Sequence, residues 1–225
     1  MPSTPEYALM AANAYAVKSN VTSIQNEISL PIAWRSLNID AINDSTGFTA
    51  RAYKSNAANE IVIAYTGTTK EPDGASDWTN GNIPGTTGWS LAKQLLDAAK
   101  FYLDVRKANQ GAEIRLTGHS LGGGLASLIS VFFDKEAKVF DEAPFGKSAT
   151  ADFAAELKTQ LAQAGYTSSA GFDLSGLESY QAGQRLGRVE SIYAKGEILT
   201  ELPNITAGTA VGLSVSKKGQ KRILL

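Results

Sequence analysis

The chain contains no cysteine and only one histidine, His119. The lack of cysteine excludes disulfides, thiolate metal sites and a cysteine nucleophile. It does not exclude export, because leaderless secretion needs no disulfides. A metal-dependent hydrolase would need several histidine, cysteine or carboxylate ligands at suitable spacing, and the sequence lacks that pattern. We therefore expect no metal and no cofactor.

The sequence also lacks long apolar runs and an excess of charge of either sign. No run approaches the roughly 18 apolar residues that a membrane helix needs. Residues 1–6 lack the basic start and apolar core of a signal peptide. The 21 Lys and Arg residues nearly balance the 22 Asp and Glu residues, which gives a net charge of −1. We expect a soluble protein that does not bind nucleic acid, in a compartment left open, and leaderless secretion is compatible with these features.

What is present is an alternation of two patterns: short apolar runs typical of strands, and segments with apolar residues at helical spacing. The expected elements are helix 6–18, strand 46–53, strand 61–65, helix 90–107, strand 113–117, helix 121–133, strand 137–140, helix 153–164, strand 189–194 and a further candidate strand at 211–215. This order predicts one α/β domain over residues 1–225, with a mostly parallel sheet covered by helices on both faces. Ligands bind such sheets beyond the carboxyl ends of the strands, so functional residues should follow strands.

The segment Gly118-His119-Ser120-Leu121-Gly122 matches the pattern Gly-x-Ser-x-Gly and lies between an expected strand and an expected helix. In a nucleophile elbow the chain turns sharply here, which strains the serine and lifts its hydroxyl to the top of the sheet. The glycines let the backbone pass closely, and the helix N-terminus favours developing negative charge. The alternative interpretation is a glycine-rich turn that serves only close packing. We favour Ser120 as a nucleophile.

His119 is next to Ser120 in sequence, but adjacent residues on a sharp turn point in different directions. The second position of the pattern usually packs against neighbouring strands. We therefore expect a structural role for His119 and not the role of general base.

The stretch Leu116 to Ala126 resembles the elbow of the class 3, or fungal-type, lipases of the α/β-hydrolase superfamily. Ile61 to Thr68 is similar to the family strand that ends in an Arg-Gly-Ser/Thr turn, with Thr66 in place of the arginine. The resemblance implies an α/β-hydrolase-like sheet. It also implies that the backbone N–H groups of Thr68 and Leu121 form an oxyanion hole.

The likeness continues on both sides of the elbow, over about residues 45 to 203, and strengthens the lipase interpretation. Residues 69–88 are rich in Gly, Thr, Asn, Asp and Pro, as a long loop or lid would be. Within them, Asp77-Trp78-Thr79-Asn80 resembles the family's lid, which carries a tryptophan. Residues 139–145 resemble the next strand and its exit. Residues 192–199 resemble the segment that bears the catalytic acid, and this places Glu197 in that role, with Glu142 as the alternative.

The general base is missing from this pattern. In the lipase family the catalytic histidine follows the acid, whereas this chain has no histidine after Ser120. The chain closes on Arg222 to Leu225, an apolar run that resembles the middle of an element. We therefore expect a truncated lipase domain, whose histidine comes from a further C-terminal segment or from a partner chain.

These features predict a carboxylic-ester hydrolase that acts on a lipid or small ester by serine acyl transfer, with interfacial contact to lipid aggregates through the lid. An esterase, a triacylglycerol lipase and a phospholipase would share them. The alternative function is a non-catalytic α/β-hydrolase-like lipid-binding module, or an inactive relative. The absent histidine supports that alternative, whereas a retained, strained elbow argues against it.

Overall fold

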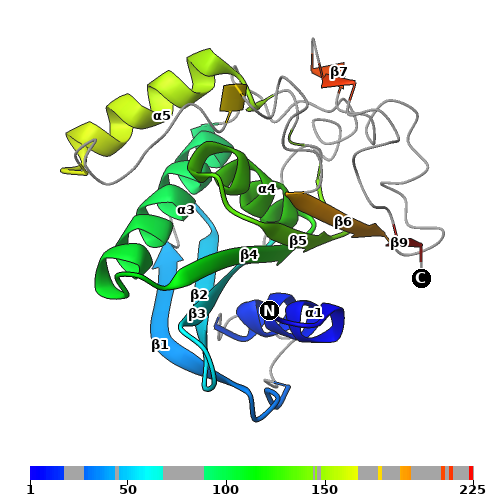
Figure 1. Cartoon of the computed structure of the whole chain (residues 1–225). Helices are drawn as coiled ribbons and strands as arrows, with labels where there is room; N and C mark the ends of the chain where they lie inside the picture. Colours follow the sequence, from blue (N-terminus) through cyan, green and yellow to red (C-terminus); the bar gives the residue numbers. More distant parts are fainter. Residues whose placement is uncertain are drawn as a thin grey trace.

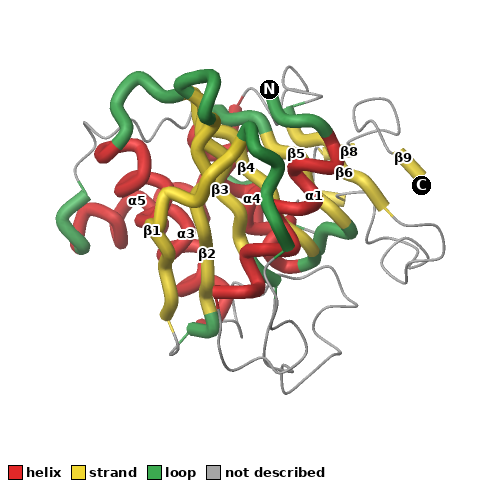
Figure 2. Tube along the Cα trace, turned by 90° about the horizontal axis from the view of Figure 1, so that it is seen from below, coloured by secondary structure: helices red, strands yellow, loops and turns green. Residues whose placement is uncertain are grey.

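The computed structural model describes residues 1–17, 28–43, 46–67, 89–143, 145, 148–166, 177–178, 188–193, 209–210, 213–214 and 223–224. Its centre is a seven-stranded sheet in the order β1-β2-β3-β4-β5-β6-β9, seen from β1 at one edge to β9 at the other in Figure 2. The strands are β1 (Trp34–Asn43), β2 (Phe48–Ser55), β3 (Glu60–Tyr65), β4 (Glu113–His119), β5 (Ala137–Phe140), β6 (Val189–Tyr193) and β9 (Ile223–Leu224).

Most strand pairs in this sheet are parallel. Strands β1, β2 and β3 pair antiparallel, and every pair from β3 through β4, β5 and β6 to β9 is parallel. Parallel neighbours need crossover connections, which here include the helices α3 (Trp89–Ala108), α4 (Leu121–Phe133) and α5 (Ala151–Gln163). The predicted α/β fold with a mostly parallel sheet is confirmed.

Helices cover both faces of the sheet, as Figure 1 shows. Helix α1 (Thr4–Asn13), followed by the 3₁₀ turn η1 (Ala14–Val17), lies on one face, whereas α3 and α4 lie on the other. The wholly buried strand β3 shows why its sequence is continuously apolar. Its alternate residues Val62 and Ala64 join the core under α1, and Ile61 and Ile63 join the core under α3 and α4.

Local signals in the sequence explain two of the helices. Helix α1 begins with a capping box, in which the backbone N–H of Ser3 donates to the Glu6 carboxylate at 2.7 Å. Every residue of α4 is buried, which accounts for its apolar and small residues on all sides. None of the helices in the described part of the chain combines the length and apolarity needed to cross a lipid bilayer.

The edge strand β1 has no counterpart among the predicted elements. Its apolar residues Leu37, Ile39 and Ala41 do alternate with polar ones and pack against the core. The pairing with β2 is interrupted between Ser36 and Asp40, and Asn38 has a φ of 52°. The irregularity divides the strand into two short alternating pieces, and this weakens its period-2 signal.

The C-terminal predictions are confirmed in part. The candidate strand at 211–215 corresponds to β8 (Leu213–Ser214), which pairs with β7 (Thr209–Ala210) in a separate two-stranded sheet. Within the apolar run at 222–225, strand β9 extends the main sheet beside β6. This run is therefore part of an element, as its composition predicts.

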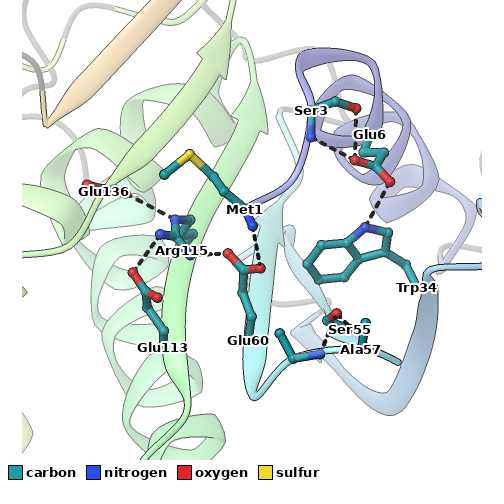
Figure 3. Close-up of polar contacts among 11 residues, drawn as sticks. Met1, Ser3, Glu6, Trp34, Ser55, Ala57, Glu60, Glu113, Arg115 and Glu136 are labelled. Atoms are coloured by element: carbon teal, nitrogen blue, oxygen red, sulfur yellow. Dashed lines mark hydrogen bonds and ion pairs between the residues drawn. The ribbon is translucent and has the colours of Figure 1, made fainter.

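An ion cluster ties together the amino-terminal ends of the central strands (Figure 3). Arg115, only 6% exposed, pairs with Glu60 at the start of β3, with Glu113 at 2.6 Å and with Glu136 at 3.0 Å. The N-terminal amino group of Met1 reaches the second oxygen of Glu60 at 3.1 Å. Since Ser120 follows the opposite end of β4, this cluster holds the edge of the sheet remote from the candidate site.

Candidate active site

The elbow is the turn that leads from β4 into α4. Ser120 has φ 56° and ψ −124°, a backbone conformation that a residue with a side chain rarely adopts. Such strain persists only where the surrounding structure enforces it, and it gathers at functional sites. The geometry therefore favours an elbow over a turn that serves only close packing.

Two glycines of the pattern are required by close approach. A Cβ added to Gly118 would lie 2.4 Å from the carbonyl carbon of Gly122. A Cβ added to Gly122 would lie 2.2 Å from the carbonyl oxygen of Tyr65, at the end of β3. The first turn of α4 is thus pressed against the ends of both β3 and β4, which leaves no space for any side chain.

We expect Gly122→Ala to lower the free energy of unfolding by about 2–3 kcal/mol, because its methyl group overlaps backbone that cannot move aside. Urea unfolding measures this loss. A matched control is Gly165→Ala, where φ is +88° but nothing lies within 4 Å of the added carbon. That variant should lose only about 1 kcal/mol, from backbone strain alone. Equal losses in the two variants would contradict the close-approach argument.

The backbone of Ser120 is held firmly while its side chain is not. Its N–H donates to the carbonyl oxygen of Phe140 at 3.0 Å, and its carbonyl oxygen accepts from the N–H groups of Gly124 at 3.1 Å and Ala143 at 2.9 Å. Ser120 is the residue before α4, yet its hydroxyl makes no capping bond. Ser120 is half-buried, and within the described part of the chain its hydroxyl has no hydrogen-bond partner.

The register of the sheet places the end of β3 beside the elbow. Tyr65 of β3 is paired with Gly118 of β4, so Thr68 and Leu121 each lie three residues beyond a paired position. The N–H of Leu121 is among the first four of α4, which have no acceptor within the helix. Gly67 is the last described residue before Thr68, and a Cβ added to it would lie 3.3 Å from the Cβ of Ser120. The turn after β3 therefore lies directly against the elbow.

His119 is exposed, and it contacts a residue from the far end of the sequence. Its Nδ1 lies 3.2 Å from the hydroxyl of Tyr15 in η1, and the two rings meet edge to face with centroids 6.2 Å apart. The expectation that His119 packs against neighbouring strands is therefore wrong. The reason is that η1 approaches the end of β4 and offers Tyr15 as the partner instead.

Glu142 follows β5 and is only 4% exposed. Its carboxylate accepts a hydrogen bond from the hydroxyl of Ser127 in α4 at 2.5 Å and another from Tyr193 of β6 at 3.2 Å. The hydroxyl of Ser191, also in β6, donates to the same carboxylate. Glu142 thus joins the elbow helix to the neighbouring strand. These contacts favour a structural role for Glu142 over that of the triad acid.

The other predicted site residues are divided between described and undescribed parts of the chain. Ser120 and Leu121 are brought together at the start of α4. Thr68, Trp78 and Glu197 lie outside the described residues, so their roles stay predictions. In the sequence, Glu197 comes four residues after Tyr193, the last residue of β6.

One residue of this site, Tyr15, could not be recognised from the sequence. It falls within the expected helix 6–18, which gives it no part in the site. Tyr15 and His119 are separated by 104 positions, and no local pattern connects them. A tyrosine placed just beyond a helix end, where its hydroxyl can reach a polar partner, is the one signal that the sequence offers.

Comparison with known proteins identifies the family. Residues 6–221 match the model of the Tle-like phospholipase domain, described as phospholipase-like. The chain belongs to this family. The match to a phospholipase-like family confirms, at that coarse level, the lipase-type hydrolase that the sequence resemblance predicts, and the fold is of the α/β-hydrolase-like type.

One solved structure supports this fold. The chain is similar to the Lip2 lipase of Yarrowia lipolytica, with 15% identity, coverage of 88% of this chain and 72% of that one, and a TM-score of 0.50. Lipase II of Rhizopus niveus matches with 14% identity, coverage of 89% and 73%, and a TM-score of 0.47. No curated protein matches the sequence.

Proposed function

We propose that this Tle-like phospholipase domain hydrolyses a carboxylic ester of a phospholipid by acyl transfer through Ser120. The observation that carries the proposal is the strained backbone of Ser120 at the start of α4, together with a hydroxyl that caps nothing. A strained serine of this kind has no use in simple packing, whereas it is the arrangement that an exposed nucleophile needs.

In the proposed reaction, the Ser120 oxygen attacks the ester carbonyl carbon while a base takes the hydroxyl proton. The carbonyl oxygen becomes an oxyanion, stabilised by the N–H groups of Leu121 and Thr68 and by the N-terminus of α4. The intermediate collapses, and the alcohol leaves with the proton from the base. Water then attacks the acyl-serine and gives a proton to the same base, which returns it to the Ser120 oxygen as the fatty acid leaves.

The base in this scheme is a histidine, oriented by Glu197, that is not among these 225 residues. His119 is the only histidine of the chain, and its Nδ1 faces the Tyr15 hydroxyl. Tyr15 cannot replace the base, because burial raises the pKa of its hydroxyl to about 12. We propose that a further segment of the same protein, or a partner chain, supplies the histidine to a single domain formed by residues 1–225.

The family description supports a phospholipid as the substrate in preference to a triacylglycerol or a small ester. In this proposal Trp78 belongs to a lid that opens at a lipid surface and uncovers an acyl-binding face. No cofactor takes part, since acyl transfer needs only the nucleophile, the base, the acid and the oxyanion donors.

The test uses a fluorophosphonate probe, which forms an Oγ–phosphorus bond with an activated serine and loses fluoride. The complete product of the reading frame that encodes this chain should gain one adduct, on Ser120, detected by mass spectrometry. The remaining serines serve as internal controls and should stay unmodified. Ser120→Ala should gain no adduct, and it should also fail to release fatty acid from phospholipid vesicles, measured beside triacylglycerol and a short-chain ester.

An adduct on a different serine would contradict the assignment of Ser120. A folded protein that gains no adduct, yet sediments with the vesicles, would favour the non-catalytic lipid-binding alternative. Faster release of fatty acid from triacylglycerol than from phospholipid would contradict phospholipid as the substrate, while the assignment of Ser120 as the nucleophile would stand.

A further inference from the structure

The hydroxyl of Tyr15 lies where the elbow meets the turn after β3. It accepts the N–H of Gly67 at 2.8 Å. It lies 3.2 Å from Nδ1 of His119, and it donates toward the carbonyl oxygen of His119 at 3.4 Å. One side chain from η1 therefore contacts the residue before Thr68 and the residue before Ser120 at once.

The position of Gly67 shows how tightly this junction is built. A Cβ added there would lie 2.4 Å from the Tyr15 hydroxyl, 2.9 Å from the carbonyl oxygen of His119 and 3.3 Å from the Cβ of Ser120. Only glycine leaves room for the tyrosine and the elbow to reach the same peptide group. The contact between the Tyr15 hydroxyl and Gly67 is therefore a part of the site itself. Tyr15 does more than cover the surface there.

We propose that Tyr15 is a positioning residue for Ser120 chemistry, which fixes the peptide of Gly67 against the elbow and thereby holds Ser120 and the N–H of Leu121 in place for the reaction. The inference rests on the proposed function, because it concerns the reactivity of Ser120. Oxyanion donors contribute only when they are held at the right place, and small displacements are costly.

The hydrogen-bond count of the Tyr15 hydroxyl fits this role. Because burial raises its pKa to about 12, the hydroxyl is neutral near pH 7 and keeps one proton to donate. It directs that proton toward the carbonyl oxygen of His119 and accepts the Gly67 N–H with its oxygen. Since Nδ1 of His119 lies 3.2 Å from the same hydroxyl, His119 is a positioning partner of Tyr15.

Tyr15→Phe tests the role, because it keeps the ring and removes the hydroxyl. Two quantities are measured in the complete product of the reading frame: the rate of fluorophosphonate labelling at Ser120, and hydrogen exchange of the Gly67 amide by NMR. Labelling should slow by roughly 10- to 100-fold, as expected for misplaced catalytic groups. Exchange of the Gly67 amide should rise by roughly five-fold or more, as expected for one lost hydrogen bond.

Tyr166→Phe is the matched control. Its hydroxyl donates to Asp104 at 3.0 Å, between the end of α5 and helix α3 and on neither the elbow nor the turn after β3. This variant should match wild type in both measurements. Gly67→Ala is a second test, because its methyl group would displace the Tyr15 hydroxyl and should slow labelling in the same way.

The outcomes separate this proposal from the proposed function. The positioning role is supported if Tyr15→Phe shows both slow labelling of Ser120 and fast exchange of the Gly67 amide, while Tyr166→Phe shows neither. Labelling at the wild-type rate in Tyr15→Phe overturns it, whatever the amide does, while Ser120 stays the nucleophile. Equal slowing in Tyr166→Phe also overturns it, because the effect would then be general destabilisation. A folded wild-type protein that gains no adduct at Ser120 overturns the proposed function, and the positioning role with it.

Discussion

Replacing Glu142 with alanine is expected to lower the free energy of unfolding by about 3–5 kcal/mol. The side chain is 4% exposed and accepts from Ser127, Ser191 and Tyr193. Its removal leaves three buried hydroxyl donors without their acceptor and opens a cavity between α4 and β6. Both effects act at α4, the helix that follows the elbow. We therefore expect the whole sheet to unfold together in one cooperative transition.

Urea unfolding followed by circular dichroism measures this loss. Glu142→Gln should lose less, because one amide oxygen still accepts while the NH₂ group cannot. Glu156→Ala, on the exposed side of α5, should change stability by no more than about 0.5 kcal/mol. A Glu142→Gln protein of wild-type stability that no longer labels at Ser120 would make Glu142 the triad acid in place of Glu197, contrary to its structural role.

The elements that could be predicted from the sequence are those with a regular pattern of burial. From Ile61 on, strand β3 is apolar because helices cover both its faces, and α4 consists of apolar and small residues because every residue is buried. The predicted bounds of α4 and β5 agree with the structure. Strand β1 was not predicted, because one edge of it faces solvent and its pairing is interrupted near Asn38.

The residues of the candidate site also differ in whether the sequence could predict them. Ser120 could be predicted because an elbow needs glycines at fixed short spacing, and the reasons for these glycines are local. The contact of Tyr15 with Gly67 and His119 depends instead on how η1 docks on the finished sheet. No periodicity in the sequence encodes that docking. The three hydroxyl donors to Glu142 likewise come from two elements that are brought together only in the folded chain.

A protein form that contains the triad histidine is expected to hydrolyse ester at least about 10⁴-fold faster than the 225-residue chain alone. The elbow and the first turn of α4 are formed within this chain. The 225-residue chain by itself should therefore still hold an ester and stabilise some oxyanion charge. Among the residues that the structure describes, no group is placed to take the Ser120 proton, since the one histidine of the chain contacts Tyr15 and burial raises the pKa of that tyrosine to about 12.

The measurement compares the 225-residue chain with the complete product of its reading frame, using release of fatty acid from phospholipid vesicles. Each histidine beyond Leu225 is then changed to alanine in turn, and a single one should account for the difference. Ser120→Ala in the complete product gives the background rate of fatty-acid release, the floor with which both forms are compared. If the reading frame ends at Leu225 and the chain alone turns over at a full rate, another group of this chain is the base and the histidine proposal is wrong. If neither form exceeds the floor, the proposed hydrolysis is wrong, and the strained elbow persists in an inactive relative or a non-catalytic lipid-binding module, the alternative that the missing histidine supports.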